Sequence, residues 1–184
     1  MKYAPERFYR RSIRLKGYDY SRPGSYFITI CTQNRECLFG EIKDGAMSLN
    51  NAGQIVAEEW EKSADIRNGI ELDEFVVMPN HLHGIIVIRR GTARRAPTAE
   101  QFGAPVAGSL PTVIRSFKSA AAKRVNEMRQ TPGAKLWQRN YYEHIIRNEN
   151  ELHGIRQYIV NNPSKWDYDR ENPEVDRYTR VNEP

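Results

Sequence analysis

The chain has 184 residues, 39% of them hydrophobic, and a formal net charge of +5, which suits one globular domain with a basic surface. No stretch approaches the roughly 18 apolar residues of a membrane span, and the first residues lack the apolar core of a signal peptide. The two cysteines, Cys31 and Cys37, form neither a Cys-x-x-Cys pair nor a disulfide framework. We therefore expect a cytoplasmic protein, and the excess of Lys and Arg indicates a polyanionic partner.

Residues 1–22 form a basic and aromatic arm, in which cationic and aromatic side chains alternate from position 7 onward. Cations pair with phosphates and aromatic rings stack on unpaired bases, so the arm is a candidate contact for nucleic acid. The alternative is a solvated arm that packs a few rings against the domain. The cationic candidates in the arm are Arg7, Arg10, Arg11, Arg14 and Lys16.

Apolar runs bounded by turn residues predict the first strands. The strands are expected at 26–32, 71–78 and 81–88, with a small hairpin formed by 38–42 and 46–49. The first strand is apolar on both faces, which is typical of a central strand. A helix is expected to run from Asn51, as N-cap with Gln54 in the capping-box position, to about Ile66.

The stretch 89–108 contains Arg94 and Arg95 among many Ala, Gly and Pro residues, and it predicts a long mobile loop. A helix capped by Ser109 follows. Its apolar stripe, expected in the core, consists of Leu110, Val113, Ile114, Phe117, Ala121, Val125 and Met128. A charged outer face is normal on an amphipathic helix, but this one has cations and no acid before Glu127. The DNA-binding candidates on it are Arg115, Lys118 and Lys123.

A fourth strand is expected at 141–147, followed by a last helix that Asn148 caps with Glu151 in the capping-box position. His144 and Arg147 on this strand are candidates for phosphate binding, although His144 fits equally well as a packed residue. The helix should stop at Asn162, because proline disfavours helical geometry in the residue before it. The domain is then expected to span 23–166, and residues 167–184 to form a polar tail.

The predicted order of the main elements is strand, helix, strand, strand, helix, strand, helix. This is the βαββαβ arrangement of a ferredoxin-like α+β fold, with an extra hairpin and a C-terminal helix. The first and third strands are central in this topology. The third strand begins at His81, so its first residues should lie in the middle of an antiparallel sheet.

His81 and His83 lie one residue apart at the start of that strand, so both side chains should point to the same side. Two neighbouring imidazoles can bind one divalent metal ion, but a His-x-His pair alone is a weak motif. Tyr158 and Asn162 lie four residues apart on one face of the last helix. The amide oxygen of Asn162 is a candidate third ligand, and a site of nitrogen and oxygen donors with open positions suits Mg²⁺ or Mn²⁺.

Other residues compete for these roles. Tyr141 or Tyr142 on the fourth strand can face the same site. Gln157 and Asn161 can replace Asn162 only if the last helix is rotated. Taken singly, Tyr158 is also compatible with a partly buried aromatic residue, and Asn162 with an ordinary residue at a helix end.

The segment Met78-Pro79-Asn80-His81-Leu82-His83 resembles the histidine-hydrophobic-histidine (HUH) motif of single-tyrosine transposases of the bacterial insertion-sequence type. Further stretches resemble the branch of REP-associated tyrosine transposases, in the same order and over about residues 11–166. They are Ser109-Leu110-Pro111 with Arg115-Ser116-Phe117-Lys118, Trp137 to Asn148, and Tyr158-Ile159-Val160-Asn161-Asn162-Pro163.

The resemblance implies that Tyr158 is the nucleophile and that His81, His83 and Asn162 hold the metal. Related transposases often have glutamine where this chain has the shorter Asn162. The implied activity is metal-dependent cleavage and rejoining of single-stranded DNA at REP-type hairpins through a 5′-phosphotyrosine link, by a monomer or homodimer at the nucleoid. The alternative is a binding module of the same fold with a structural metal. A His-x-His hydrolase is poorly supported, because only His144 and His153 are left and neither has ligand-like spacing.

Overall fold

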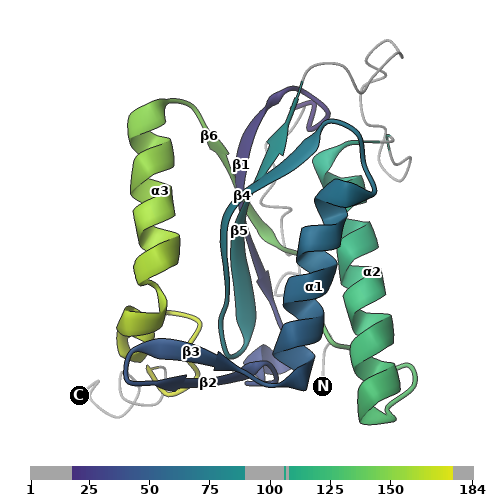
Figure 1. Cartoon of the computed structure of the whole chain (residues 1–184), viewed down its shortest axis with the longest axis vertical. Coiled ribbons are helices and arrows are strands. Elements are labelled where there is room, and N and C mark those ends of the chain that lie inside the picture. Colours follow the sequence, from purple (N-terminus) through teal and green to yellow (C-terminus); the bar gives the residue numbers. More distant parts are fainter. Residues whose placement is uncertain (1–17, 90–105, 107, 176–184) are drawn as a thin grey trace, which may run out of the picture.

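The structure is a computed structural model that describes residues 18–89, 106 and 108–175. A four-stranded antiparallel sheet with the order β4-β5-β1-β6 forms its centre. The helices α1 and α2 cover one face of this sheet, and α3 covers the other (Figure 1). The strands are β1 (Gly24–Cys31), β4 (Ile70–Val77), β5 (His81–Ile88) and β6 (Tyr142–Ile146), and the helices are α1 (Asn51–Asp65), α2 (Leu110–Arg129) and α3 (Glu149–Asn161).

This order confirms the expected ferredoxin-like topology with β1 and β5 in the centre. Both strands are apolar on their two faces because each face packs on a separate core. The larger core contains Trp60 of α1 and Phe117 of α2 and lies between the sheet and these helices. The smaller one contains Phe27, Ile85 and Ile159 and lies under α3.

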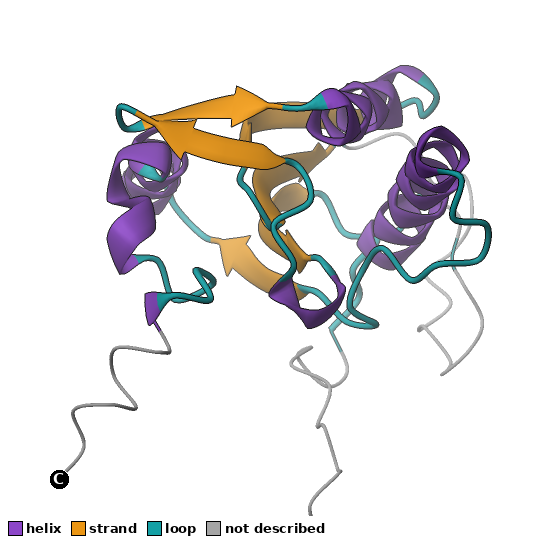
Figure 2. Cartoon of the chain, turned by 90° about the horizontal axis from the view of Figure 1, so that it is seen from below, coloured by secondary structure: helices purple, strands orange, loops and turns teal. Residues whose placement is uncertain are grey.

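The expected hairpin is formed by β2 (Gly40–Lys43) and β3 (Ala46–Leu49), and its turn residues Asp44 and Gly45 both have positive φ. The hairpin crosses one end of the main sheet (Figure 2), where β3 contacts both α1 and the 3₁₀ helix η3 (Pro163–Tyr168). The hairpin therefore closes the end of the molecule at which β5 begins.

Two local predictions need correction, and the expected end of the last helix is confirmed. The N-cap of α1 is Asn50 and not Asn51, because Asn50 is extended and its Oδ1 accepts from the N–H groups of Ala52 and Gly53. Met128 lies outside the core with 41% of its surface exposed, since the buried face of α2 ends at Val125 and Asn126. The helix α3 does end at Asn162, which is its C-cap residue. Its backbone nevertheless keeps right-handed helical φ and ψ although a proline follows, and the chain continues directly into η3.

Ser109 is the N-cap residue of α2, and Asn148 is that of α3, where its side chain accepts from the N–H of Glu151. The carboxylate of Glu151 does not close a capping box. It accepts instead from the N–H of Arg147 and from Nε2 of His144. Within the described ranges, none of the helices is long and apolar enough to cross a membrane.

Candidate metal and tyrosine site

The histidine pair opens β5 and faces α3. His81 is opposite Cys31 and His83 is opposite Thr29 in the register of β1 with β5, so both rings project from the same face of the sheet. The side chains are buried, with 0% of His81 and 3% of His83 exposed. Their Nε2 atoms lie 3.0 Å apart. Two nitrogen ligands at right angles on one ion, each with a bond of roughly 2.1 Å, would be separated by about the same distance.

Each imidazole is held through its other nitrogen. Nδ1 of His81 lies 2.8 Å from Oδ1 of Asn80, and Nδ1 of His83 lies 2.8 Å from the hydroxyl of Thr29. Such partners orient metal-binding histidines and leave Nε2 to face the ion. The two Nε2 atoms therefore point into one site.

Both histidines are neutral at physiological pH. Burial lowers the pKa of His81 to about 3, and the nearby guanidinium of Arg35 acts in the same direction. Burial also lowers the pKa of His83 well below its usual range, and its neighbour His81 adds to the effect. Neutral imidazole is the form that binds metal ions, so no proton has to be removed first.

The tyrosine of α3 lies beside this pair. The hydroxyl of Tyr158 is 3.2 Å from Nε2 of His83, and their rings are 5.2 Å apart. The residue remains 45% exposed, so the hydroxyl lies at the boundary between the buried pair and solvent. Burial raises the pKa of Tyr158, the carboxylate of Asp169 raises it further, and the side chain of Asn162 opposes the rise.

Asn162 is 3% exposed, and its Oδ1 has no hydrogen-bond partner among the described residues. The side chain is close enough to His81 and Tyr158 to shift the pKa of each. Its helical backbone continues the rise of α3, which puts Asn162 one turn after Tyr158 on the same face. A buried amide oxygen normally has a hydrogen-bond partner. The unpartnered Oδ1 of Asn162 beside the histidine pair is therefore consistent with a further metal ligand.

The structure adds Asp169, which the sequence reasoning missed. Its side chain is 6% exposed, and Oδ2 lies 3.9 Å from Nε2 of His81. The ligand atoms of His81, His83 and Asp169 all lie within 4.8 Å of one another, so these three residues can bind one metal ion. Two imidazoles, a carboxylate and an amide oxygen form a donor set that fits a divalent cation.

Asp169 lies in the segment that was expected to begin a polar tail, and that expectation does not hold for residues 167–175. The backbone of Glu171 accepts from Asn80, and Asn172 is 5% exposed. A sequence signal for this packing was Trp166, whose ring lies 6.1 Å from that of His81. A polar composition concealed the docking, because the contacts are hydrogen bonds rather than an apolar stripe.

The two competing tyrosines at the start of β6 point to opposite faces of the sheet. Tyr141 packs against the core on the α1 and α2 side. Tyr142 pairs with Thr29 and projects toward the same side as Tyr158, with its ring 6.3 Å from that of Phe27. Among the tyrosines that the structure describes, the hydrogen bond to the histidine pair comes from Tyr158.

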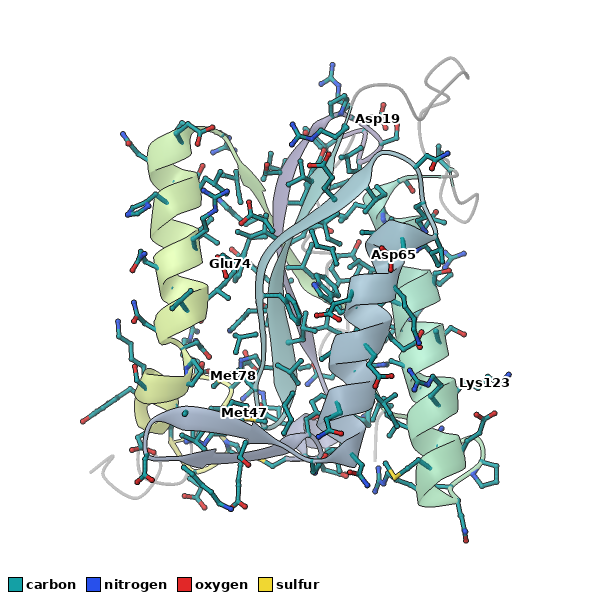
Figure 3. The ribbon with its side chains drawn as sticks, in the orientation of Figure 1. Asp19, Met47, Asp65, Glu74, Met78 and Lys123 are labelled. Atoms are coloured by element: carbon teal, nitrogen blue, oxygen red, sulfur yellow. The ribbon has the colours of Figure 1, made fainter. Side chains whose placement is uncertain are left out.

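The DNA-binding candidates are not gathered at this site. Arg115 and Lys123 are exposed on α2, on the opposite side of the sheet from α3, as the position of Lys123 in Figure 3 shows. Lys118 donates to the carbonyl oxygens of Gln138 and Arg139, at 2.6 and 3.2 Å. The candidates of the N-terminal arm and of the loop lie outside the described residues, namely Arg7, Arg10, Arg11, Arg14, Lys16, Arg94 and Arg95.

His144 faces the α3 side of the sheet, and Arg147 directly follows the end of β6. Nε2 of His144 is 2.6 Å from Glu151, so its imidazole already has a partner. The side chain of Arg147 is exposed just after the strand. Arg147 is therefore an exposed cation between β6 and α3, and it stays a candidate for contact with DNA.

No family model matches the chain, but two curated proteins are similar to it in sequence. A protein of uncharacterised function from Haemophilus influenzae is 43% identical over 171 residues, which cover 88% of this chain and 92% of that protein. A second protein of that organism, described as a proposed REP-associated tyrosine transposase, is 24% identical over 150 residues, or 82% of this chain and 76% of its own length.

Among solved structures, a REP-associated tyrosine transposase bound to a REP hairpin has a TM-score of 0.53 and 21% identity, over 83% of this chain and 73% of that one. This likeness concerns the fold. The chain thus has the fold of this transposase, and it is similar in sequence to a protein described as a REP-associated tyrosine transposase.

Proposed function

We propose that the protein is a metal-dependent endonuclease and strand transferase that cleaves and rejoins single-stranded DNA at REP-type hairpins. The observation that carries this proposal is the 3.2 Å separation between the hydroxyl of Tyr158 and Nε2 of His83. A nucleophile beside a group of metal-binding side chains is the arrangement that phosphodiester cleavage by a tyrosine requires. Tyr158 is 45% exposed, so its side chain is accessible from solvent.

In the proposed reaction, the oxygen of Tyr158 attacks the phosphorus in line with the leaving 3′ oxygen. The new bond joins Tyr158 to the 5′ phosphate, the bond from phosphorus to O3′ breaks, and O3′ takes up a proton while the phenol loses one. The 3′ hydroxyl of another strand can then attack the phosphotyrosine, which reverses the step and joins strands. The phosphodiester bond energy is kept in the tyrosine link, so no water has to be activated.

His81, His83 and Asp169 are the proposed ligands of the metal, with Asn162 as a fourth donor. Oxygen and imidazole donors favour Mg²⁺ or Mn²⁺. The bound ion would supply positive charge to the scissile phosphate as negative charge develops on it. The side chain of Asn162 also favours the ionised phenol of Tyr158, which burial otherwise disfavours.

The proposed partner is a DNA hairpin with a short unpaired flank. The related transposase of known structure is bound to a REP hairpin, which supports this class of partner. Stem contacts would go mostly to phosphates, and unpaired bases would be read by stacking and hydrogen bonds. Tyr158 reaches the histidines of its own chain, so we propose that one chain can form a complete site, as a monomer or within a homodimer.

The test is a covalent adduct between the protein and a labelled hairpin with a single-stranded flank. With Mn²⁺ or Mg²⁺, the wild type should give a labelled band that survives a denaturing gel, and Tyr158→Phe should give none. Tyr142→Phe is the matched control, because Tyr142 has the same 45% exposure on the same side of the sheet. This control should keep the adduct.

An adduct that persists in Tyr158→Phe would assign the nucleophile to another residue. A wild type that binds the hairpin but forms no adduct with either metal would favour the binding module with a structural ion.

A further inference from the structure

Asn80 is a completely buried side chain, and all of its hydrogen-bonding groups have partners at the site. Its Nδ2 donates to the carbonyl oxygens of Arg35 and Glu171, at 3.0 and 2.7 Å. Its Oδ1 lies 2.8 Å from Nδ1 of His81. One amide thus connects the loop after β1, the start of β5 and the segment that contains Asp169.

These contacts determine which nitrogen of His81 carries the proton. Two carbonyl oxygens can only accept, so the NH₂ group of Asn80 must face them and its oxygen must face His81. An amide oxygen also only accepts, so Nδ1 of His81 must be the donor. The Nε2 of this neutral ring is then left with a free electron pair, directed at the metal position.

His83 differs from His81 in this respect. The partner of its Nδ1 is the hydroxyl of Thr29, which can either donate or accept. This contact orients the ring without selecting a tautomer. Of the two imidazoles, His81 is therefore the one whose protonated nitrogen is imposed by the protein.

The same amide also holds the segment around Glu171 in place. The carboxylate of Glu171 pairs with Nε of Arg35 at 2.9 Å, and Asn80 binds the carbonyl oxygens of both residues. Asp169 lies two residues earlier in this segment. Its approach to His81 therefore depends on a docking contact that Asn80 makes with the backbone.

We propose that Asn80 is a positioning residue of the metal site, which fixes His81 as the Nδ1–H tautomer and docks the segment that brings Asp169 to it. This inference rests on the proposed function only where it concerns metal binding. The tautomer is a property of the metal-free protein and can be measured there.

The first experiment measures the tautomer in the metal-free wild type by long-range ¹H–¹⁵N correlation NMR of the imidazoles. The expected result is a protonated Nδ1 and an unprotonated Nε2 on His81. A proton on Nε2 of His81 would overturn the proposal. This measurement needs no variant, so it decides the matter even if substitutions at Asn80 prevent folding.

The second experiment titrates Mn²⁺ into wild type, Asn80→Ala and Asn126→Ala by isothermal calorimetry. Loss of a partner of this kind typically weakens metal binding by about 10- to 100-fold, and we expect that loss for Asn80→Ala. Asn126 is a matched control because it is also a buried asparagine whose Nδ2 donates to a carbonyl oxygen, that of Ala134, but on α2. Asn126→Ala should bind Mn²⁺ like the wild type.

Asn80→Asp separates the effect on the tautomer of His81 from the effect on the docking of the segment that contains Asp169. A carboxylate still accepts from Nδ1 of His81, but it places an oxygen against the carbonyl oxygens of Arg35 and Glu171. We expect the wild-type tautomer together with weakened Mn²⁺ binding. Unchanged Mn²⁺ affinity in both Asn80 variants would overturn the proposal. A wild type that binds no Mn²⁺ would instead contradict the metal chemistry of the proposed function, and the NMR result would still decide the role of Asn80.

Discussion

At the scale of single residues, Gly84 determines how closely β5 can pack against α1. A Cβ atom at Gly84 would lie 2.5 Å from Cζ2 of Trp60, whose side chain is completely buried. We predict that Gly84→Ala lowers the free energy of unfolding by about 1–3 kcal/mol, the usual cost of overpacking a core. Urea unfolding followed by Trp fluorescence measures this change.

Gly154→Ala is the control at the same scale. A Cβ atom at this exposed position of α3 would have no neighbour within 4 Å. Alanine is a better helix former than glycine by about 1 kcal/mol, so the control should be equally or more stable than the wild type. A Gly84→Ala variant as stable as this control would show that Trp60 moves aside freely.

At the scale of elements, α3 is attached to the sheet by a small apolar cluster, by the contact of Glu151 with His144 of β6 and by the ion pair of Arg156 with Asp73 of β4. The register shift in β4 contains Asp73, which bonds Arg156, two residues before Tyr158. The guanidinium of Arg156 holds the pKa of Asp73 below its usual value. We predict that Asp73→Asn lowers the free energy of unfolding by about 1 kcal/mol at pH 7. It should also weaken adduct formation, because it loosens the helix that carries Tyr158.

The pH dependence of this effect has a defined sign. Because the folded state lowers the pKa of Asp73, its stabilisation is complete above the unfolded value of about 3.9 and is lost as the pH falls through the lower folded value. Urea unfolding at a series of pH values should show the two proteins converging in acid. Glu71 lies on the same strand as Asp73 and forms an exposed pair with Arg89, which follows β5. Glu71→Gln removes this pair and should change the free energy of unfolding little. An equal effect of the two substitutions would argue against a role for Asp73 in holding α3.

At the scale of the whole molecule, the site joins β5 to the end of α3 and the segment after η3, and Tyr158 is 75 residues from His83 in the sequence. A ligand that binds only the folded state stabilises it, by about 2.7 kcal/mol at 100 times its Kd. We predict that Mn²⁺ raises the melting temperature of the wild type by several degrees and that Asp169→Ala loses most of this increase. Differential scanning calorimetry with and without Mn²⁺ measures the increment.

Asp167→Ala is the matched control, because Asp167 is an exposed carboxylate in the same segment. It should keep the Mn²⁺-dependent increase. If Asp169→Ala keeps it as well, Asp169 is not a ligand, and the donors would reduce to the histidines and Asn162.

The pattern of the chain was enough to predict the strand order and the position of the histidines. Alternating apolar runs determine which strands have two buried faces, and the period of a strand puts His81 and His83 on one side. Helical spacing likewise put Tyr158 and Asn162 on one face, and both residues do lie beside the pair. These predictions succeeded because the direction of a side chain on a strand or helix follows from its spacing along the chain.

Asp169 and the contacts of Asn80 could not be found in this way, because they depend on how a polar segment returns to β5. A carboxylate in a polar sequence carries no sign of the imidazole that it will approach. The sequence by itself therefore determined the sheet, the histidine pair and the tyrosine helix, since each follows from local periodicity. Only the tertiary structure decided which acid lies beside the histidines and which amide holds them, because hydrogen bonds between distant segments leave no periodic trace in the chain.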